Sequence, residues 1–433
     1  MLSSLDSPAP LQVPQVPQVP QVPQVPQVPQ VPQVPPVPQV PQVPLPRPAS
    51  VYIHFPWCLA KCPYCDFVSY AHARETIDSR GYADAVLREL AARREAIGRR
   101  TIRSVFFGGG TPSLWDPAEL GRVLAGIRGA FDMADGAEVT VECNPTSLDR
   151  ARADALAAAG VNRLSVGTQS LDAEQLRFLG RLHDPQGALA ALDAALASDI
   201  ARVTTDLIFG LPGQTPEDAR AQAVTLAEHE HAGRRLTHLS CYQLTIEPGT
   251  QFGALAKRGR LPLADDALVT DAFLRIDEAL GERGLRHYEI SNYAVPGDEA
   301  RHNLGYWRGE EYVGLGCAAY GMLRDGRAGV RYRNLVEPKG YMEAARRCGI
   351  QSTSEPLDAE SLLRERIMLG LRLSEGLDLD ACGQDLGLDP WTVERKRDVE
   401  RLVARGRLAR EGARLRVPRE AWIWTDDTAA RLF

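Results

Sequence analysis

Six short apolar segments alternate with helical segments between residues 51 and 244, and this alternation constrains the fold more than any other feature. The expected strands are Val51–Phe55, Ser104–Phe107, Glu138–Cys143, Arg163–Gln169, Val203–Phe209 and His238–Leu244. Strands that alternate with helices predict a parallel sheet with the helices outside it. Six units are fewer than the eight of a closed barrel. We therefore expect an α/β fold whose core, over residues 50–295, is a partial (β/α)6 barrel.

The first 49 residues differ in composition from the rest. From Val13 to Leu45 the triplet Val-Pro-Gln repeats almost without interruption. A proline at every third position removes backbone donors and favours an extended polyproline II conformation. We expect residues 1–49 to form a disordered or semi-rigid tail. Such a tail is either a dispensable extension or a ligand for a proline-binding groove.

The chain after the core divides into two parts. Residues 296–357, rich in Gly, Tyr, Arg and Asn, are expected to connect the core to residues 358–433. The latter predict a smaller α+β domain of winged-helix-like shape, with helices over Leu377–Leu386 and Trp391–Arg405 and a hairpin over Leu408–Val417. This shape occurs in DNA-binding proteins. The formal charge of −6 instead favours a packing module and no nucleic-acid partner.

Cysteine usage and hydropathy indicate the compartment. Eight cysteines in 433 residues are too few for a disulfide scaffold. The sequence contains no run of about 18 uninterrupted apolar residues, which a membrane-spanning helix would require. We expect a soluble protein of the reducing cytoplasm.

Three of these cysteines lie close together, as Cys58, Cys62 and Cys65, directly after the first predicted strand. Thiolates are soft ligands, and three on one short loop can hold three corners of an iron–sulfur cube. With no fourth cysteine nearby, one iron would remain open to another ligand. The alternative is a structural zinc site completed by His54 or Asp66.

Other polar residues fall at the ends of the predicted strands, where sites form in parallel architectures. Gly108-Gly109-Gly110-Thr111-Pro112 follows the second strand and lets a ligand approach the backbone. Glu142 ends the third strand and Gln169 the fourth. Asp206 lies in an apolar strand, either as the partner of an arginine or as a ligand contact.

With these residues the chain resembles radical S-adenosylmethionine (SAM) proteins. More narrowly, it resembles the oxygen-independent coproporphyrinogen III oxidases and their haem-chaperone relatives of the HemW type, over about residues 50–430. The resemblance implies a [4Fe-4S] cluster on Cys58, Cys62 and Cys65, with SAM bound at its open iron. The implied contacts to SAM are Tyr52, Tyr64, Gly109, Gly110, Thr111, Glu142, Gln169, Arg181 and Asp206. No side chain is assigned a catalytic role, because the cofactor carries the chemistry.

Two positions favour the chaperones over the oxidases. The oxidases have a fourth cysteine where this chain has Phe67, and the chaperones have the HNxxYW pattern found here from His302 to Trp307. An imidazole can ligate haem iron, so His302 is a candidate haem ligand. Alternatively, it is a buried polar residue beside two packing aromatic rings.

The resemblance thus implies a haem chaperone that passes haem to apoproteins. A membrane-associated protein is among the candidate acceptors. The cluster would receive its electrons from a separate electron donor. The alternatives are an oxygen-independent coproporphyrinogen III oxidase of porphyrin biosynthesis and a radical enzyme with an unrelated substrate. Whether the protein is an enzyme stays open at this point.

Overall fold

The computed structural model of the protein describes residues 47–98, 100–347 and 352–433. Residues 1–46 of the predicted tail lie outside this range. The first strand, β1 (Arg47–Phe55), includes the last three residues of that predicted tail. Pro48 stands beside a β-bulge at Ala49 and Ser50, where the ladder with β4 (Arg100–Gly109) shifts its register. The start of a strand and a bulge are the places where a sheet accepts proline.

The six predicted strands are confirmed and form the centre of one twelve-stranded sheet. They are β1, β4, β5 (Asp132–Cys143), β6 (Arg163–Gln169), β7 (Arg202–Phe209) and β10 (His238–Gln243), and each pairs in parallel with the next. The sheet is open, because β11 (Arg286–Glu289) and β16 (Ser352–Leu357) are its two edges. A partial (β/α)6 barrel is therefore the correct description of the core.

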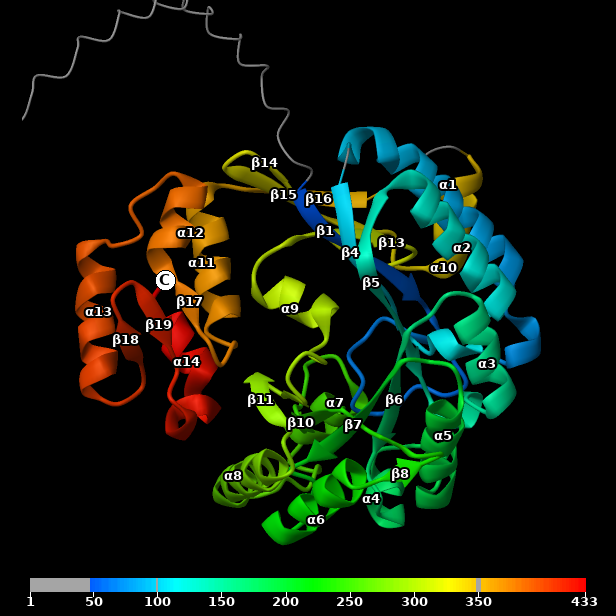
Figure 1. The fold of residues 1–433 in the computed structure, drawn as a ribbon, viewed down its shortest axis with the longest axis horizontal. Coiled ribbons are helices and arrows are strands. Elements are labelled where there is room, and N and C mark those ends of the chain that lie inside the picture. The colour runs from blue at the N-terminus through cyan, green and yellow to red at the C-terminus, as the bar shows by residue number, and fades with distance from the viewer. Residues whose placement is uncertain (1–46, 99, 348–351) are drawn as a thin grey trace, which may run out of the picture. The chain divides into compact units, whose positions relative to one another are not determined.

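Helices follow the strands as predicted. They are α1 (Ser79–Ile97), α2 (Pro117–Ala130), α3 (Arg150–Ala158), α4 (Ala173–Phe178), α5 (Pro185–Ala197), α6 (Pro216–Ala227) and α8 (Asp266–Glu282). The short helix α7 (Gln251–Lys257) was not predicted. Several begin at an Asp or Thr whose side chain accepts a backbone N–H of the first turn, as Asp116 does in α2 and Thr215 in α6. Figure 1 shows α1, α2, α3 and α5 on the outer face of the sheet and α9 (Arg301–Trp307) on the opposite face.

Two regions differ from expectation. The sequence also predicts one strand over Arg286–Tyr293, where the structure has two antiparallel strands, β11 and β12 (Asn292–Ala294), joined by a tight turn. The expected connection 296–357 contains helices α9 and α10 (Pro338–Arg346) and continues the sheet. There β13 (Glu311–Leu315) pairs in parallel with β1, followed by antiparallel β14 (Tyr320–Asp325), β15 (Ala328–Asn334) and β16. The glycines in these strands weaken the alternation from which strands are predicted.

The last part of the chain has the predicted α+β composition. It comprises α11 (Ala359–Gly370), β17 (Leu377–Asp378), α12 (Leu379–Leu386), α13 (Val393–Ala404), β18 (Ala409–Glu411), β19 (Arg414–Arg416) and α14 (Thr425–Ala430). The three strands form a small separate sheet, and Gly412 (φ 63°) supplies the hairpin turn. Trp422 Nε1 donates to the Ile290 carbonyl at 3.3 Å, which joins this part to the core. Within the described ranges, no helix has the length and apolar character of a membrane span.

Candidate functional site

The loop that carries the three cysteines is closed at its base by two short strands. β2 (Trp57–Cys58) pairs in parallel with β3 (Tyr70–Ala71). Cys58, Cys62 and Cys65 carry free, partly exposed thiols. All three line one cavity of about 440 Å³ that is otherwise built from the carboxyl ends of the parallel strands. The predicted ligands therefore converge on the edge of the sheet where a cofactor is expected.

Side chains from other elements support the sulfur atoms. Thr111 Oγ1 donates to Cys58 Sγ at 3.4 Å, and Arg181 donates to Cys62 Sγ at 3.5 Å. Donors of this kind stabilise thiolate ligands and tune the potential of a cluster. Burial raises the pKa of Cys58, and that of Cys65 to about 11, so metal binding must displace protons from these thiols. Three thiols with two donors behind them fit the implied [4Fe-4S] cluster.

The environment of His54 argues against the zinc alternative. Its Nε2–H donates to the Val68 carbonyl at 2.8 Å, and burial lowers its pKa to about 4, so the ring is neutral. Nδ1 then accepts from the Tyr52 hydroxyl at 3.0 Å. Both nitrogens are occupied, so His54 is not free to complete a zinc site. His54 instead anchors the cysteine loop to β1.

The glycine turn is packed against this loop from the other side. Gly110 N–H donates to the Phe55 carbonyl at 2.6 Å, and Thr111 N–H to the Trp57 carbonyl at 2.8 Å. A Cβ at Gly109 (φ 111°) would lie 2.5 Å from the ring of His54, so no other residue fits there. Since these N–H groups are occupied, the turn offers carbonyl oxygens to a ligand. An ammonium group, which can only donate, suits such acceptors.

Two partly buried carboxylates, Glu142 and Asp206, line the cavity. Glu142 Oε2 accepts from Gly109 N–H at 3.0 Å, and Asp206 accepts from Ser165 Oγ at 3.3 Å. Burial, followed by the charge of Asp206, raises the pKa of Glu142 to about 7. Burial raises the pKa of Asp206 to about 6. A paired cation would relieve both costs, so the arrangement suits a ligand that carries positive charge.

The remaining predicted contacts divide between two cavities. Tyr64, Gln169 and Arg181 line the 440 Å³ cavity together with the glycine turn, and Gln169 adopts φ 67°, a rare backbone conformation for this residue type. Tyr52 and His302 do not line this cavity. They line a second one, of about 230 Å³, deeper inside the sheet. Glu142, Ser165, Asp206 and Tyr242 contribute to the walls of both cavities.

His302 is fully enclosed in this inner cavity. Only 2% of the residue is exposed, and burial lowers its pKa to about 3. Nδ1 lies 2.9 Å from Ser104 Oγ and Nε2 lies 3.2 Å from the Tyr306 hydroxyl. Its ring stacks on Phe106 with a centroid distance of 4.8 Å. In this conformation neither ring nitrogen is free to bind a metal.

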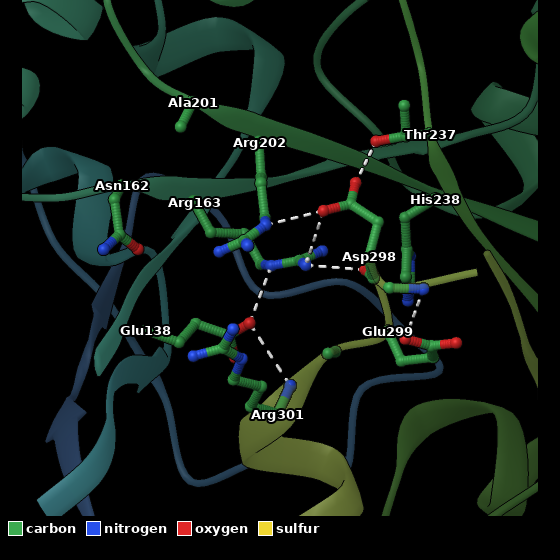
Figure 2. Close-up of polar contacts among 12 residues, drawn as sticks. Glu138, Asn162, Arg163, Ala201, Arg202, Thr237, His238, Asp298, Glu299 and Arg301 are labelled. Atoms are coloured by element: carbon green, nitrogen blue, oxygen red, sulfur yellow. Dashed lines mark hydrogen bonds and ion pairs between the residues drawn. The ribbon is translucent and has the colours of Figure 1, made fainter. Parts of the chain in front are cut away.

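An ion-pair network holds the start of α9 against the sheet (Figure 2). Arg163 Nε lies 3.0 Å from Glu138 Oε2, and Arg163 also donates to the backbone carbonyl of Asp298 at 2.7 Å. Arg202 and Thr237 bind the Asp298 carboxylate. Glu138 in turn accepts the backbone N–H groups of Arg301 and His302 at 3.2 and 3.1 Å. This network fixes the helix that carries the HNxxYW pattern.

Sequence reasoning missed this network and the inner cavity. The signal was present in the strands, where alternate positions are polar, as in Thr140 and Glu142 or Arg163 and Ser165. Alternate residues of a strand point to the same face. The reasoning that singled out Asp206 as a costly charge in an apolar strand applies equally to Glu138 and Arg163.

Comparisons with known proteins agree with this geometry. Residues 52–222 match the model of the radical SAM superfamily, and residues 357–424 match that of the HemN C-terminal domain. The chain is 40% identical to heme chaperone HemW of Escherichia coli over 302 residues, which are 68% of this chain and 76% of the relative. It is 35% identical to heme chaperone HemW of Mycobacterium tuberculosis over 372 residues, 85% of this chain and 90% of the relative.

A solved structure extends the comparison to the fold. Coproporphyrinogen III oxidase (HemN) of Escherichia coli superposes with a TM-score of 0.74 at 23% identity, covering 89% of this chain and 90% of that one. At this identity the superposition shows a common fold. Identity above 30% across most of the relatives' length shows more, and on that basis the chain belongs to the HemW family of radical SAM proteins.

Proposed function

We propose that this protein is a haem chaperone, which binds haem in the cytoplasm and passes it to haem-requiring apoproteins. A membrane-associated protein is among the candidate acceptors. Phe67 is the residue that favours this function over that of the oxidase. Its side chain, 58% exposed, lies in the wall of the cofactor cavity at the position where the resembling oxidases have a fourth cysteine. Relatives named heme chaperone HemW, at 33–40% identity, support the same choice.

The 440 Å³ cavity would hold both the [4Fe-4S] cluster and SAM. Cys58, Cys62 and Cys65 would bind three irons, with Thr111 and Arg181 donating to the sulfur atoms. Carbonyl oxygens of the glycine turn and the carboxylates of Glu142 and Asp206 are the acceptors for the ammonium and ribose hydroxyl groups of SAM. When bound, the cluster would supply the electron for cleavage of SAM. The side chains orient the cofactor and exclude water from it.

Binding of haem iron by His302 requires a change from the described conformation. Tyr306 would have to release Nε2, and the inner cavity of about 230 Å³ would have to open, because a macrocycle is larger than this space. Visible spectra of haem-loaded protein test this role. A His302→Ala variant with the wild-type spectrum would remove His302 from the haem site. Tyr306→Phe, which frees Nε2 and keeps the ring, should bind haem at least as tightly as the wild type.

Two assays on one anaerobically reconstituted preparation test the function. One titrates the protein with haem. The other incubates it with coproporphyrinogen III, SAM and a reductant. Haem binding without decarboxylation supports the chaperone. Decarboxylation above the level of a Cys62→Ala control would replace it with the oxidase, whose fold the chain shares.

A further inference from the structure

A surface cleft lies next to the cysteine-loop region and is separate from the SAM cavity, with Arg181 as the lining residue common to both. Its volume is about 440 Å³, and its walls come from residues 145–146, which follow β5, and from residues 173–187, which include α4 and the start of α5. Leu182, 61% exposed, is part of its rim. A narrow pocket lined by Ala60, Cys62 and Leu182 connects this region to the cysteine loop.

One side chain spans the distance between the cleft and the cluster ligands. Arg181 lines the cleft, the narrow pocket and the SAM cavity, and it donates to Cys62 Sγ at 3.5 Å and to the Gly167 carbonyl at 2.9 Å. The turn before it is pressed against the loop, because a Cβ at Gly180 (φ 67°) would lie 2.6 Å from Pro63. A molecule seated in the cleft is thus one side chain away from a ligand sulfur.

The cleft is lined by two arginines and one carboxylate, which leaves an excess of positive charge. Arg177 and Arg181 make no ion pair with a carboxylate in the described part of the chain, and Arg177 is exposed. The carboxylate in the lining, Asp184, is occupied as the N-cap of α5 and accepts the Gly187 N–H at 2.7 Å. His183 adds an unpaired buried acceptor, because Nε2–H donates to the Thr168 carbonyl and Nδ1 has no partner. The exposed Leu182 beside the exposed Arg177 suits an acidic protein surface that carries an apolar contact.

We propose that this cleft, defined by Arg177, Arg181 and Leu182, is the docking surface of the electron donor, and that the donor is a small acidic redox protein that carries one electron at a time. The inference rests on the proposed cluster at Cys58, Cys62 and Cys65. In each encounter the docked protein loses one electron and the cluster gains one, without proton or group transfer. The cleft and the SAM cavity have separate linings apart from Arg181, so donor and SAM can be bound together.

Stopped-flow reduction of the reconstituted cluster tests this surface, with the full chain and with reduced flavodoxin, an acidic flavoprotein, as the probe. A double variant, Arg177→Glu with Leu182→Glu, changes two exposed side chains and leaves the cysteine loop intact. We expect a bimolecular rate constant at least about tenfold below that of the wild type at low ionic strength. Added salt should slow the wild type and leave the variant nearly unaffected.

Two controls separate docking from damage to the cluster. Dithionite, a small reductant that needs no docking surface, should reduce the clusters of variant and wild type at equal rates. If dithionite does not reduce the cluster, the proposed cluster itself is in error. Leu268→Glu with Arg275→Glu makes the same chemical change on α8 and should reduce normally with flavodoxin. Wild-type rates in the cleft variant, or an equal loss in the α8 variant, would overturn the proposal. So would a wild-type cluster that neither flavodoxin nor a [2Fe-2S] ferredoxin reduces.

Discussion

Replacing Glu142 by Gln should make the protein more stable without its cofactors and weaken its hold on SAM. Glu142 is partly buried, and its pKa rises from the usual 4.5 to about 7, first through desolvation and then through Asp206. One pKa unit corresponds to about 1.4 kcal/mol, so the folded protein pays roughly 3 kcal/mol to ionise this group. Gln cannot ionise, and its amide oxygen can still accept from Gly109 N–H. The variant therefore loses the cost and keeps the hydrogen bond.

The sign of this effect fixes its pH dependence. Between about pH 4.5 and 7 the unfolded wild type releases the Glu142 proton while the folded protein retains it, so wild-type stability falls as pH rises through this window. The variant has no such loss. Its advantage should be near zero at pH 4.5, grow through the window and level off above pH 7 at about 3 kcal/mol. Relief of the charge on Asp206, whose own pKa is about 6, adds to the same trend.

Urea unfolding of cofactor-free protein, kept anaerobic and reduced, measures this difference at several pH values. Glu174→Gln, an exposed site on α4, is the matched control and should show no pH-dependent gain. Equal stability of Glu142→Gln and wild type at pH 8 would refute the electrostatic reasoning. Equilibrium dialysis measures the SAM affinity of the same variant. If stability rises while SAM affinity is unchanged, Glu142 destabilises the folded protein but does not contact SAM.

Three further predictions follow from the same contacts. SAM should bind about tenfold more tightly at pH 8 than at pH 6, because Glu142 with a pKa of about 7 becomes ionised over this range, and calorimetric titration measures the change. Gly180→Ala should lower stability by about 1–3 kcal/mol and reduce iron content after reconstitution, because the new methyl group meets Pro63 and the φ of 67° disfavours Ala. Arg163→Met should cost about 3–5 kcal/mol in chemical unfolding, because it leaves buried Glu138 without its cation, and a loss below 1 kcal/mol would contradict the network.

The parts of the fold that depend on strong local patterns were predictable from the sequence. The six core strands are short apolar segments between helices with clear caps, and the spacing of Cys58, Cys62 and Cys65 predicts that their thiols lie close together, as they do in one cavity. The strands β13, β14 and β15 were not predictable, because each contains a glycine that breaks its pattern, and the partner of β13 in the core, β1, lies far away in the chain. The same limit applies to Tyr52. Its place in the sequence puts it near the cysteines, but alternation along β1 turns it into the inner cavity and toward His302.

The pairing of β1 with β13 has a consequence for how the chain folds as it is synthesised. Val51 pairs with Val105 on one side and with Val313 on the other, so one edge of β1 has no partner until most of the chain has emerged. An unpaired strand edge invites pairing with other chains, and contacts distant in sequence form slowly. The cysteine loop follows β1 directly, so the strand that supports it is completed late. Fragments that end before residue 311 should aggregate, and insertion of iron and sulfur should succeed only after the ribosome has delivered β13.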